Sequence, residues 1–239
     1  MRIAVLLKEV PDTYSDREMN LETGLTDRSG DVVADEVSER AVEAALRIAE
    51  AAGDDTVVEI LSVGPESAAD SVRRGIAMGA SEAYIVSDDA LTGADATLTG
   101  EVLAKLVEKQ GYDLVVAGGM SSDGAAGVVA PFVAELLGWP VLTNLTELSI
   151  DGDSVRATQA SETATAELSA QLPAVVSVAD GFADPRYPNF KGLMAAKKQE
   201  LDHVTLAELG IDPTDYARPR AIMVGIERRP ARERGEIID

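Results

Sequence analysis

The sequence has no cysteine and a single histidine, His203, and its acidic residues outnumber its basic residues by 42 to 21. Without cysteine, disulfides, thiolate catalysis and Cys-ligated metal sites are excluded. A single histidine argues against a multi-histidine metal site and against a Ser-His catalytic triad. The formal net charge of −21 repels the phosphates of nucleic acids and the anionic surface of membranes. We therefore expect no metal site, no nucleic-acid partner and no direct membrane insertion.

Long apolar runs are also missing, since no stretch approaches the roughly 18 residues that a membrane-spanning helix requires. The N-terminal sequence MRIAVLLK lacks the charged region, long apolar region and cleavage site of a signal peptide. These two absences predict a cytoplasmic protein.

The acidic residues are spread along the whole chain, and the basic residues are mostly Arg, with six Lys. This composition is typical of proteins that remain soluble at high salt, where repulsion between like charges is screened. A basic partner is the alternative explanation for the charge. We favour the first explanation and expect a protein from a salt-adapted, halophilic source.

Strand and helix patterns alternate through the first 140 residues. Apolar runs at 3–7, 56–63, 83–86 and 113–117 predict strands, and amphipathic stretches at 36–52, 64–78, 94–107 and 124–137 predict helices. A turn-rich stretch at 20–33 predicts a small hairpin or loop. This order predicts an α/β fold with an open, mostly parallel, Rossmann-like nucleotide-binding sheet and helices on both faces.

After Pro140 the pattern changes to successive strands, at 141–150, 154–158, 163–168 and 174–178. They predict an antiparallel excursion over about residues 141–172 that returns to the main sheet. One short helix at 205–209, followed by proline and charge, predicts an extended C-terminal arm. We therefore divide the chain into an α/β domain at 1–200 and an arm at 201–239.

Ligands of open α/β sheets bind beyond the carboxyl ends of the strands, and the end near residue 118 carries the clearest pattern. The Gly118-Gly119 pair lets the backbone pass close to a ligand, and Ser122-Asp123-Gly124 precedes a predicted helix. Free N–H groups at that helix start favour an anion such as phosphate. The alternative is that Ser122 or Asp123 only caps the helix. Lys8, after the first strand, either neutralises a phosphate or is a solvated charge.

Other phosphate-binding and catalytic motifs are absent. The sequence has no G-x-x-x-x-G-K-[ST], and no G-x-G-x-x-G follows its first strand. No general acid/base pair stands out among the 42 acidic residues. The residues therefore indicate binding more than catalysis, although a stand-alone nucleotide-binding domain that senses or hydrolyses ATP stays open as an alternative.

A segment near the C-terminal end predicts a protein-docking site. The apolar strand at 174–178 is followed by Asp184-Pro185-Arg186-Tyr187, by an exposed loop that carries Phe190, and by an amphipathic helix that ends in lysines. One large apolar residue held out between rigid elements is suited to insertion into a partner's pocket.

Several stretches, in order over about residues 1–200, resemble the β subunit of electron transfer flavoprotein. They are MRIAVLLKEVPDT, NLETGLTDRSG, DEVSERAVEAALRIAE, SVGPESAADSVRRGIAMGAS, DLVVAGGMSSDGAAGVVAPFVAELLGWP, LPAVVSV and DPRYPNFKGLMAAKK. The resemblance implies a fold of the adenine nucleotide α-hydrolase type and a heterodimer with an α subunit, which holds most of one FAD. The heterodimer would carry electrons from acyl-CoA-type dehydrogenases of fatty acid oxidation to a quinone oxidoreductase. The chain would be an electron carrier without chemistry of its own on an organic substrate.

The resemblance also implies two binding regions in this chain. In this family the β subunit holds AMP or, in electron-bifurcating members, a second FAD. The positions expected to bind it are Leu6, Lys8, Asp35, Val63, Gly64, Ser122, Asp123, Gly124, Gly127, Val128 and Val129. An apolar residue after D-P-R-Y inserts into the partner dehydrogenase, and Phe190 stands at that position. The partner-binding positions are Arg186, Tyr187, Phe190, Leu193 and Met194.

The nucleotide loop departs from the family pattern. Asp35 stands where members usually have Asn, and its carboxylate would repel a phosphate that it faced. Ala125, Val128 and Val129 replace side chains of the family's D-G-[DN]-x-x-Q-[VT]-G, so only backbone N–H groups remain as ligands. These departures argue against nucleotide binding in this subunit, and a nucleotide-free scaffold subunit is a further interpretation of the sequence.

Overall fold

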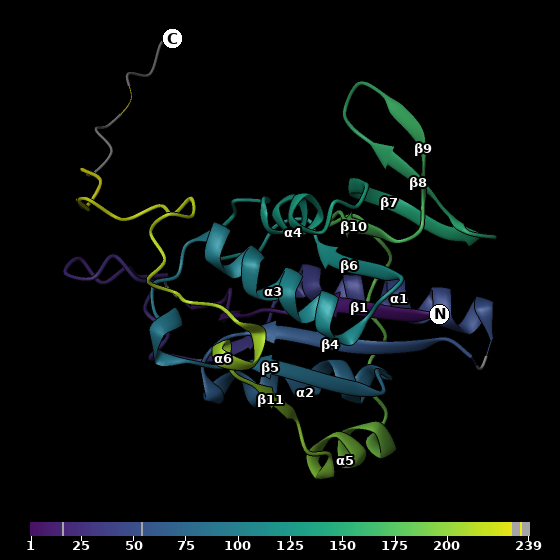
Figure 1. The fold of residues 1–239 in the computed structure, drawn as a ribbon, viewed down its shortest axis with the longest axis horizontal. Helices are drawn as coiled ribbons and strands as arrows, with labels where there is room; N and C mark the ends of the chain where they lie inside the picture. Colours follow the sequence, from purple (N-terminus) through teal and green to yellow (C-terminus); the bar gives the residue numbers. More distant parts are fainter. Residues whose placement is uncertain (16, 54, 231–234, 236–239) are drawn as a thin grey trace.

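The computed structural model describes residues 1–15, 17–53, 55–230 and 235. Within these residues a nine-stranded sheet has the strand order β11-β5-β4-β1-β6-β10-β7-β8-β9 (Figure 1). Neighbouring strands from β11 to β7 are parallel, and β8 and β9 are antiparallel additions at one edge. The strands are β1 (Arg2–Leu6), β4 (Val57–Val63), β5 (Glu82–Val86), β6 (Leu114–Gly118), β7 (Val141–Asp151), β8 (Ser154–Ala160), β9 (Thr165–Gln171), β10 (Ala174–Val178) and β11 (Asp202–Val204). This confirms the predicted open, mostly parallel α/β fold.

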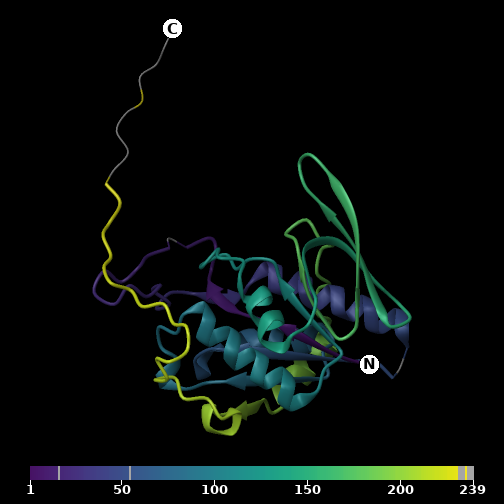
Figure 2. The same ribbon diagram turned by 45° about the horizontal axis from the view of Figure 1, so that its top comes forward.

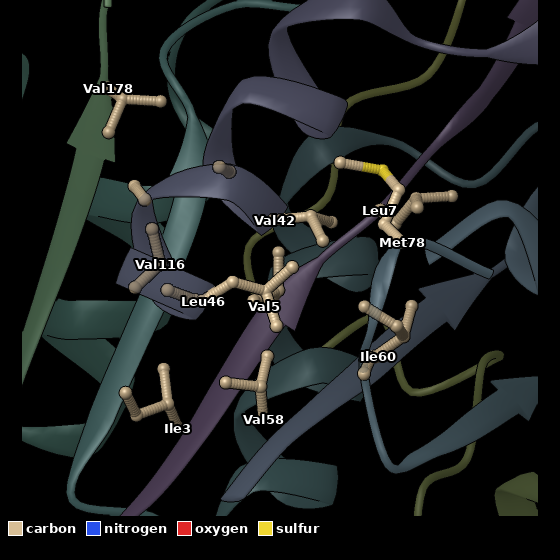
Figure 3. Packing of buried hydrophobic residues seen from close by; sticks show 14 of the residues in the cluster. Ile3, Val5, Leu7, Val42, Leu46, Val58, Ile60, Met78, Val116 and Val178 are labelled. Atoms are coloured by element: carbon tan, nitrogen blue, oxygen red, sulfur yellow. The ribbon is translucent and has the colours of Figure 1, made fainter. Parts of the chain in front are cut away.

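Helices cover both faces of the parallel part of the sheet. On one face, α1 (Glu36–Ala52) and α2 (Ala69–Met78) pack on residues such as Ile3 and Val5 of β1. On the other face, α3 (Ala96–Gln110), α4 (Val129–Leu137) and the short α6 (Leu206–Leu209) pack on Ala4 and Leu6. Figure 3 shows Val42 of α1 close to Val5 in the first of these layers. Because β1 is covered on both faces, its sequence is a continuous apolar run instead of an alternating one.

The excursion after residue 140 lies where the sequence predicts it. The first residues of β7 pair in parallel with β10, and its later residues extend past the sheet and pair antiparallel with β8. β8 in turn pairs antiparallel with β9. The resulting hairpin projects beyond the helices in both ribbon views (Figure 1, Figure 2). A tight turn at Asp151-Gly152-Asp153 joins β7 to β8, with Gly152 at a positive φ of 60°.

Two local expectations differ from the structure. The helix expected from Gly124 begins at Val129, because residues 121–128 form a loop with Ala125 and Gly127 at positive φ. The stretch at 20–33, expected as a hairpin or loop, is mostly loop, and its last residues belong to β3 (Val32–Ala34), which pairs antiparallel with β2 (Glu9–Pro11). Phe190 is the first residue of α5 (Phe190–Lys198) and does not belong to the preceding loop.

The first residues of the predicted arm pack against the main sheet. β11 pairs in parallel with β5, and the side chains of Leu201, Val204, Leu206, Leu209 and Ile211 are buried. Beyond this point no described residue is helix or strand, and the chain runs past α3 towards the loop that contains Gly24, where Met223 lies (Figure 1, Figure 2). The parts of the predicted arm at 231–234 and 236–239 lie outside the described residues. The division into a domain and an arm stays a prediction.

No helix in the described part of the chain is both long and apolar enough to cross a membrane.

Candidate functional site

The strand order places a crevice between the carboxyl ends of β1 and β6. From β1 the chain moves in one direction to β4 and β5, and it then returns to add β6 and β10 on the other side of β1. This reversal between β1 and β6 is the position at which open α/β sheets bind ligands. Lys8 follows β1, the loop of residues 119–128 follows β6, and the Lys8 ammonium reaches that loop, 3.3 Å from Ser121 Oγ. We call this crevice and its loop the switch-point site.

Asp123 is held between two cations in the switch-point site. Its side chain is 3% exposed, and its two carboxylate oxygens lie 2.7 Å from Lys8 Nζ and 2.6 Å from Arg28 Nη2. Gly124 N–H also donates to it. Burial raises the pKa of the Asp123 carboxyl, but the hydrogen bonds and charge of Lys8 outweigh burial and hold that pKa well below its usual range. Asp123 is therefore an ionised counter-charge within the chain and does not cap a helix.

Asp35 is also fully engaged within the chain. It is the N-cap of α1 and accepts from the backbone N–H and the hydroxyl of Ser38, while its other oxygen accepts from Ser122 N–H at 2.9 Å. The side chain is 1% exposed. Asp35 thus joins the start of α1 to the loop after β6. The predicted repulsion of a phosphate is weakened, since N–H groups already surround the carboxylate.

The two glycines at the end of β6 also have a packing role. A Cβ on Gly118 would lie 3.0 Å from the backbone carbon of Val37, and a Cβ on Gly119 would lie 2.6 Å from Asn144 Oδ1. Both glycines therefore permit close packing against α1 and β7, and their predicted role in the approach of a ligand stays a prediction.

The other predicted nucleotide-site residues surround the crevice at different depths. The Leu6 side chain is buried in the core on the α3 side, so only its backbone faces the site. Gly64, beside Val63 on the neighbouring strand, donates its N–H to Val86 O. Gly127 has a φ of 66°, and Val128 is the residue before α4, which begins at Val129. Arg28 and Arg17, which contact Asp123 and the carbonyl of Ser122, belong to the site and were missed in the sequence.

The switch-point site retains groups that suit an anion. Within the described residues the N–H groups of residues 126–128 donate to no protein acceptor, and the buried hydroxyl of Ser122 has no hydrogen-bond partner. The Lys8 side chain is 43% exposed. Backbone N–H groups with one accessible ammonium fit a phosphate. Among the described residues no group of His, Asp or Glu could hold a metal ion.

The predicted partner-binding segment presents aromatic side chains to solvent. Tyr187 is 91% exposed and Phe190 is 78% exposed, and Leu193 and Met194 follow on the first turns of α5. Asn189 caps α5 by accepting from Gly192 N–H at 2.8 Å. Arg186 differs from the others, because its guanidinium binds Glu43 and Glu50 of α1. The segment therefore combines a fastened base with an apolar tip.

Comparison with known proteins identifies relatives along nearly the whole chain. The sequence model of the electron transfer flavoprotein domain matches residues 23–209. A protein of Mycobacterium tuberculosis named electron transfer flavoprotein subunit beta is 40% identical over 241 residues, which span 98% of this chain and 91% of that protein. The protein of the same name from Bacillus subtilis is 31% identical over 100% of this chain and 91% of its own length. The one from Megasphaera elsdenii is 31% identical over 89% of this chain and 81% of its own length.

Proposed function

The chain belongs to the electron transfer flavoprotein family as a β subunit, and we propose that it acts in a heterodimer with an α subunit that carries electrons through FAD. When bound, FAD supplies the electron-accepting and electron-donating chemistry. This chain supplies a rigid platform for the α subunit and the surface that recognises the electron donor. It performs no bond chemistry on an organic substrate. The donors are acyl-CoA-type dehydrogenases, and the acceptor is a quinone oxidoreductase.

The observation that carries the docking part of this proposal is the exposed Phe190 at the start of α5. A phenylalanine that is 78% exposed, three residues after a tyrosine that is 91% exposed, presents apolar surface to water, which is unfavourable. Three of the six lysines of the chain, Lys191, Lys197 and Lys198, lie on the same helix, although the net charge is −21. This arrangement supports a partner with an apolar pocket and an acidic rim.

Co-expression with an α subunit tests the proposal as a whole. A yellow heterodimer that a dehydrogenase reduces is expected. A colourless monomer that hydrolyses ATP would support the stand-alone nucleotide-binding domain instead.

Substitution of Phe190 tests the docking surface. Phe190→Ala removes an apolar side chain whose burial in a pocket is worth about 2 kcal/mol, so reduction by the dehydrogenase should slow while flavin content stays unchanged. The control is Leu136→Ala, which removes an exposed apolar side chain from α4. Equal reduction rates for Phe190→Ala and wild type would remove Phe190 from the docking surface.

For the switch-point site we propose an adenine nucleotide whose phosphate is bound by the N–H groups of residues 126–128 and by Lys8. The unpaired N–H groups and the unpaired Ser122 hydroxyl favour this function over an empty scaffold. Denaturing the purified heterodimer and identifying the released nucleotides tests it. We expect each heterodimer to release a second nucleotide, either AMP or a second FAD, besides its one FAD. One FAD with no other nucleotide would contradict the proposal.

A further inference from the structure

One face of α1 carries a regular stripe of alternating charge, which we call the α1 charge stripe. Its members are Glu36, Arg40, Glu43, Arg47 and Glu50, at successive spacings of four, three, four and three residues. This spacing places all five side chains on one side of the helix. Arg40 pairs with Glu36 at 3.0 Å, and Arg47 pairs with Glu43 at 2.7 Å.

The α1 charge stripe holds the chain that leads from β10 to the docking surface. Arg40 donates to the carbonyl of Phe182 and to the Asp184 carboxylate. Glu43 accepts from the Arg186 guanidinium at 2.7 Å, and Glu50 binds the other side of the same guanidinium. These residues are more than 130 positions apart in the sequence, so the contacts define how the segment lies on α1.

Glu43 is the most buried member of the stripe, and it also bonds the main chain of Arg186. Its side chain is 5% exposed, whereas that of Glu50 is 61% exposed. Besides the guanidinium, Glu43 accepts from the backbone N–H of Arg186 at 3.1 Å. A buried carboxylate that bonds a backbone N–H fixes the main chain itself, one residue before Tyr187 and four before Phe190.

The far side of the docking surface is fixed independently. Helix α5 packs closely on α2, because a Cβ on Gly192 would lie only 2.5 Å from Ala77 O. Gln199 Nε2, just after α5, donates to Ser81 O at 2.7 Å. Tyr187 and Phe190 therefore lie between two fixed points, of which Arg186 is the first.

We propose that Glu43 is a positioning residue for partner docking, which pre-orients Tyr187 and Phe190 by holding Arg186. The inference rests on the proposed docking function of Phe190. A segment that is ordered in advance loses less conformational entropy when it binds. Loss of the contact between Glu43 and Arg186 therefore weakens docking without altering the surface that docks.

The test uses the flavin-containing heterodimer with four variants: Glu43→Gln, Glu43→Asp, Arg47→Gln and Phe190→Ala. Arg47→Gln is the matched control, since Arg47 pairs with Glu43 and, among the described residues, forms no hydrogen bond or ion pair with the docking segment. Two measurements are made. Hydrogen–deuterium exchange of the peptide at 183–189 reports whether the segment is held, and steady-state reduction by an acyl-CoA dehydrogenase gives KM for the flavoprotein and kcat.

Glu43→Gln should speed exchange at 183–189 and raise KM about tenfold, a factor that corresponds to about 1.4 kcal/mol, with kcat and flavin content unchanged. Glu43→Asp, which keeps the charge, should recover part of the loss, and Arg47→Gln should resemble wild type. Unchanged exchange in Glu43→Gln would show that the anchor does not hold the segment. If Glu43→Gln exchanges faster but keeps a wild-type KM, while Phe190→Ala raises KM, the positioning role of Glu43 is overturned and the docking function of Phe190 is not. A wild-type KM for Phe190→Ala would instead overturn the docking function on which the inference rests.

Discussion

Replacing Asp123 with Asn tests whether the buried counter-charge stabilises the switch-point site. Asn keeps the shape of the side chain but removes the charge that binds Lys8 at 2.7 Å and Arg28 at 2.6 Å. The variant also leaves an amide nitrogen where a carboxylate oxygen accepted a hydrogen bond from a cation. Both effects act on a side chain that is 3% exposed, so water cannot compensate for them at Asp123 itself.

The size of the loss follows from the exposure of the partners. Removing one partner from a fully buried ion pair costs about 3–5 kcal/mol, because a charge stays buried without compensation. Lys8 and Arg28 are 43% and 33% exposed, so water solvates part of the released charge and the cost falls to about 2–3 kcal/mol. For a chain of 239 residues each kcal/mol shifts the melting temperature by about 2–4 °C, so a decrease of about 4–12 °C is expected.

The assay is thermal unfolding by circular dichroism at one fixed salt concentration, with Asp151→Asn as the control. Asp151 pairs with Arg156 at the same distance of 2.7 Å, but its side chain is 63% exposed. Both variants change the net charge by the same amount, and an exposed pair contributes about 0.2–1 kcal/mol. A loss in Asp123→Asn no larger than that in Asp151→Asn would refute the reasoning, since burial would then have no effect on the value of the pair.

Three further predictions test other parts of the molecule. With a net charge of −21, the melting temperature should fall on dialysis from molar to millimolar salt, and an unchanged value would contradict the salt-adapted interpretation. Gly192→Ala should separate α5 from α2, because the new Cβ would lie 2.5 Å from a backbone oxygen. The free energy of unfolding, measured with urea, should fall by about 1–3 kcal/mol. Gly181→Ala is the control and should leave the free energy of unfolding unchanged, because its Cβ would meet no atom within 4 Å. Burial raises the pKa of the Glu43 carboxyl, but the hydrogen bonds from Arg186 and Arg47 have the larger effect, and the pKa lies below its ordinary value of 4.5. A depressed pKa stabilises the folded state at pH values above the pKa of the unfolded chain. Protection of 183–189, measured relative to the intrinsic exchange rate at each pH, should therefore fall only as pH drops below about 4.5, and Glu43→Gln should not show this step.

The order of the elements in this fold could be predicted from sequence periodicity. The strands β1 and β6 are mostly apolar runs, β4 is apolar apart from Glu59 and Ser62, and α1 shows an apolar face and ends at Gly53. Such patterns follow from local geometry and from burial on both faces. The three-residue strand β11 could not be predicted, because the sequence Asp-His-Val has no apolar pattern and is a strand only through its pairing with β5.

The start of α4 could not be predicted because a distant charge decides it. Ser-Ser-Asp-Gly is a favourable N-cap sequence, but the Asp123 carboxylate binds Lys8 and Arg28, which lie 115 and 95 residues away. With Asp123 turned to these cations, the chain needs five more residues before α4 begins at Val129. Likewise the α1 charge stripe is visible in the sequence as alternating charge at helical spacing, but the sequence does not show that Arg186 pairs with it.

The two candidate sites differ in where their unsatisfied groups lie, and this difference bears on which function each can have. In the switch-point site Asp123 is paired with Lys8 and Arg28, and among the described residues the groups left without partners are the N–H groups of residues 126–128 and the Ser122 hydroxyl. Backbone N–H groups of this kind suit a small anion. At the docking surface the charge of Arg186 is neutralised by Glu43, and the rings of Tyr187 and Phe190 are exposed. Exposed rings on a fixed base gain free energy only by burial in another molecule, at about 25 cal/mol for each Å² removed from water. Because the base is fixed before docking, little of that gain is spent on ordering the segment.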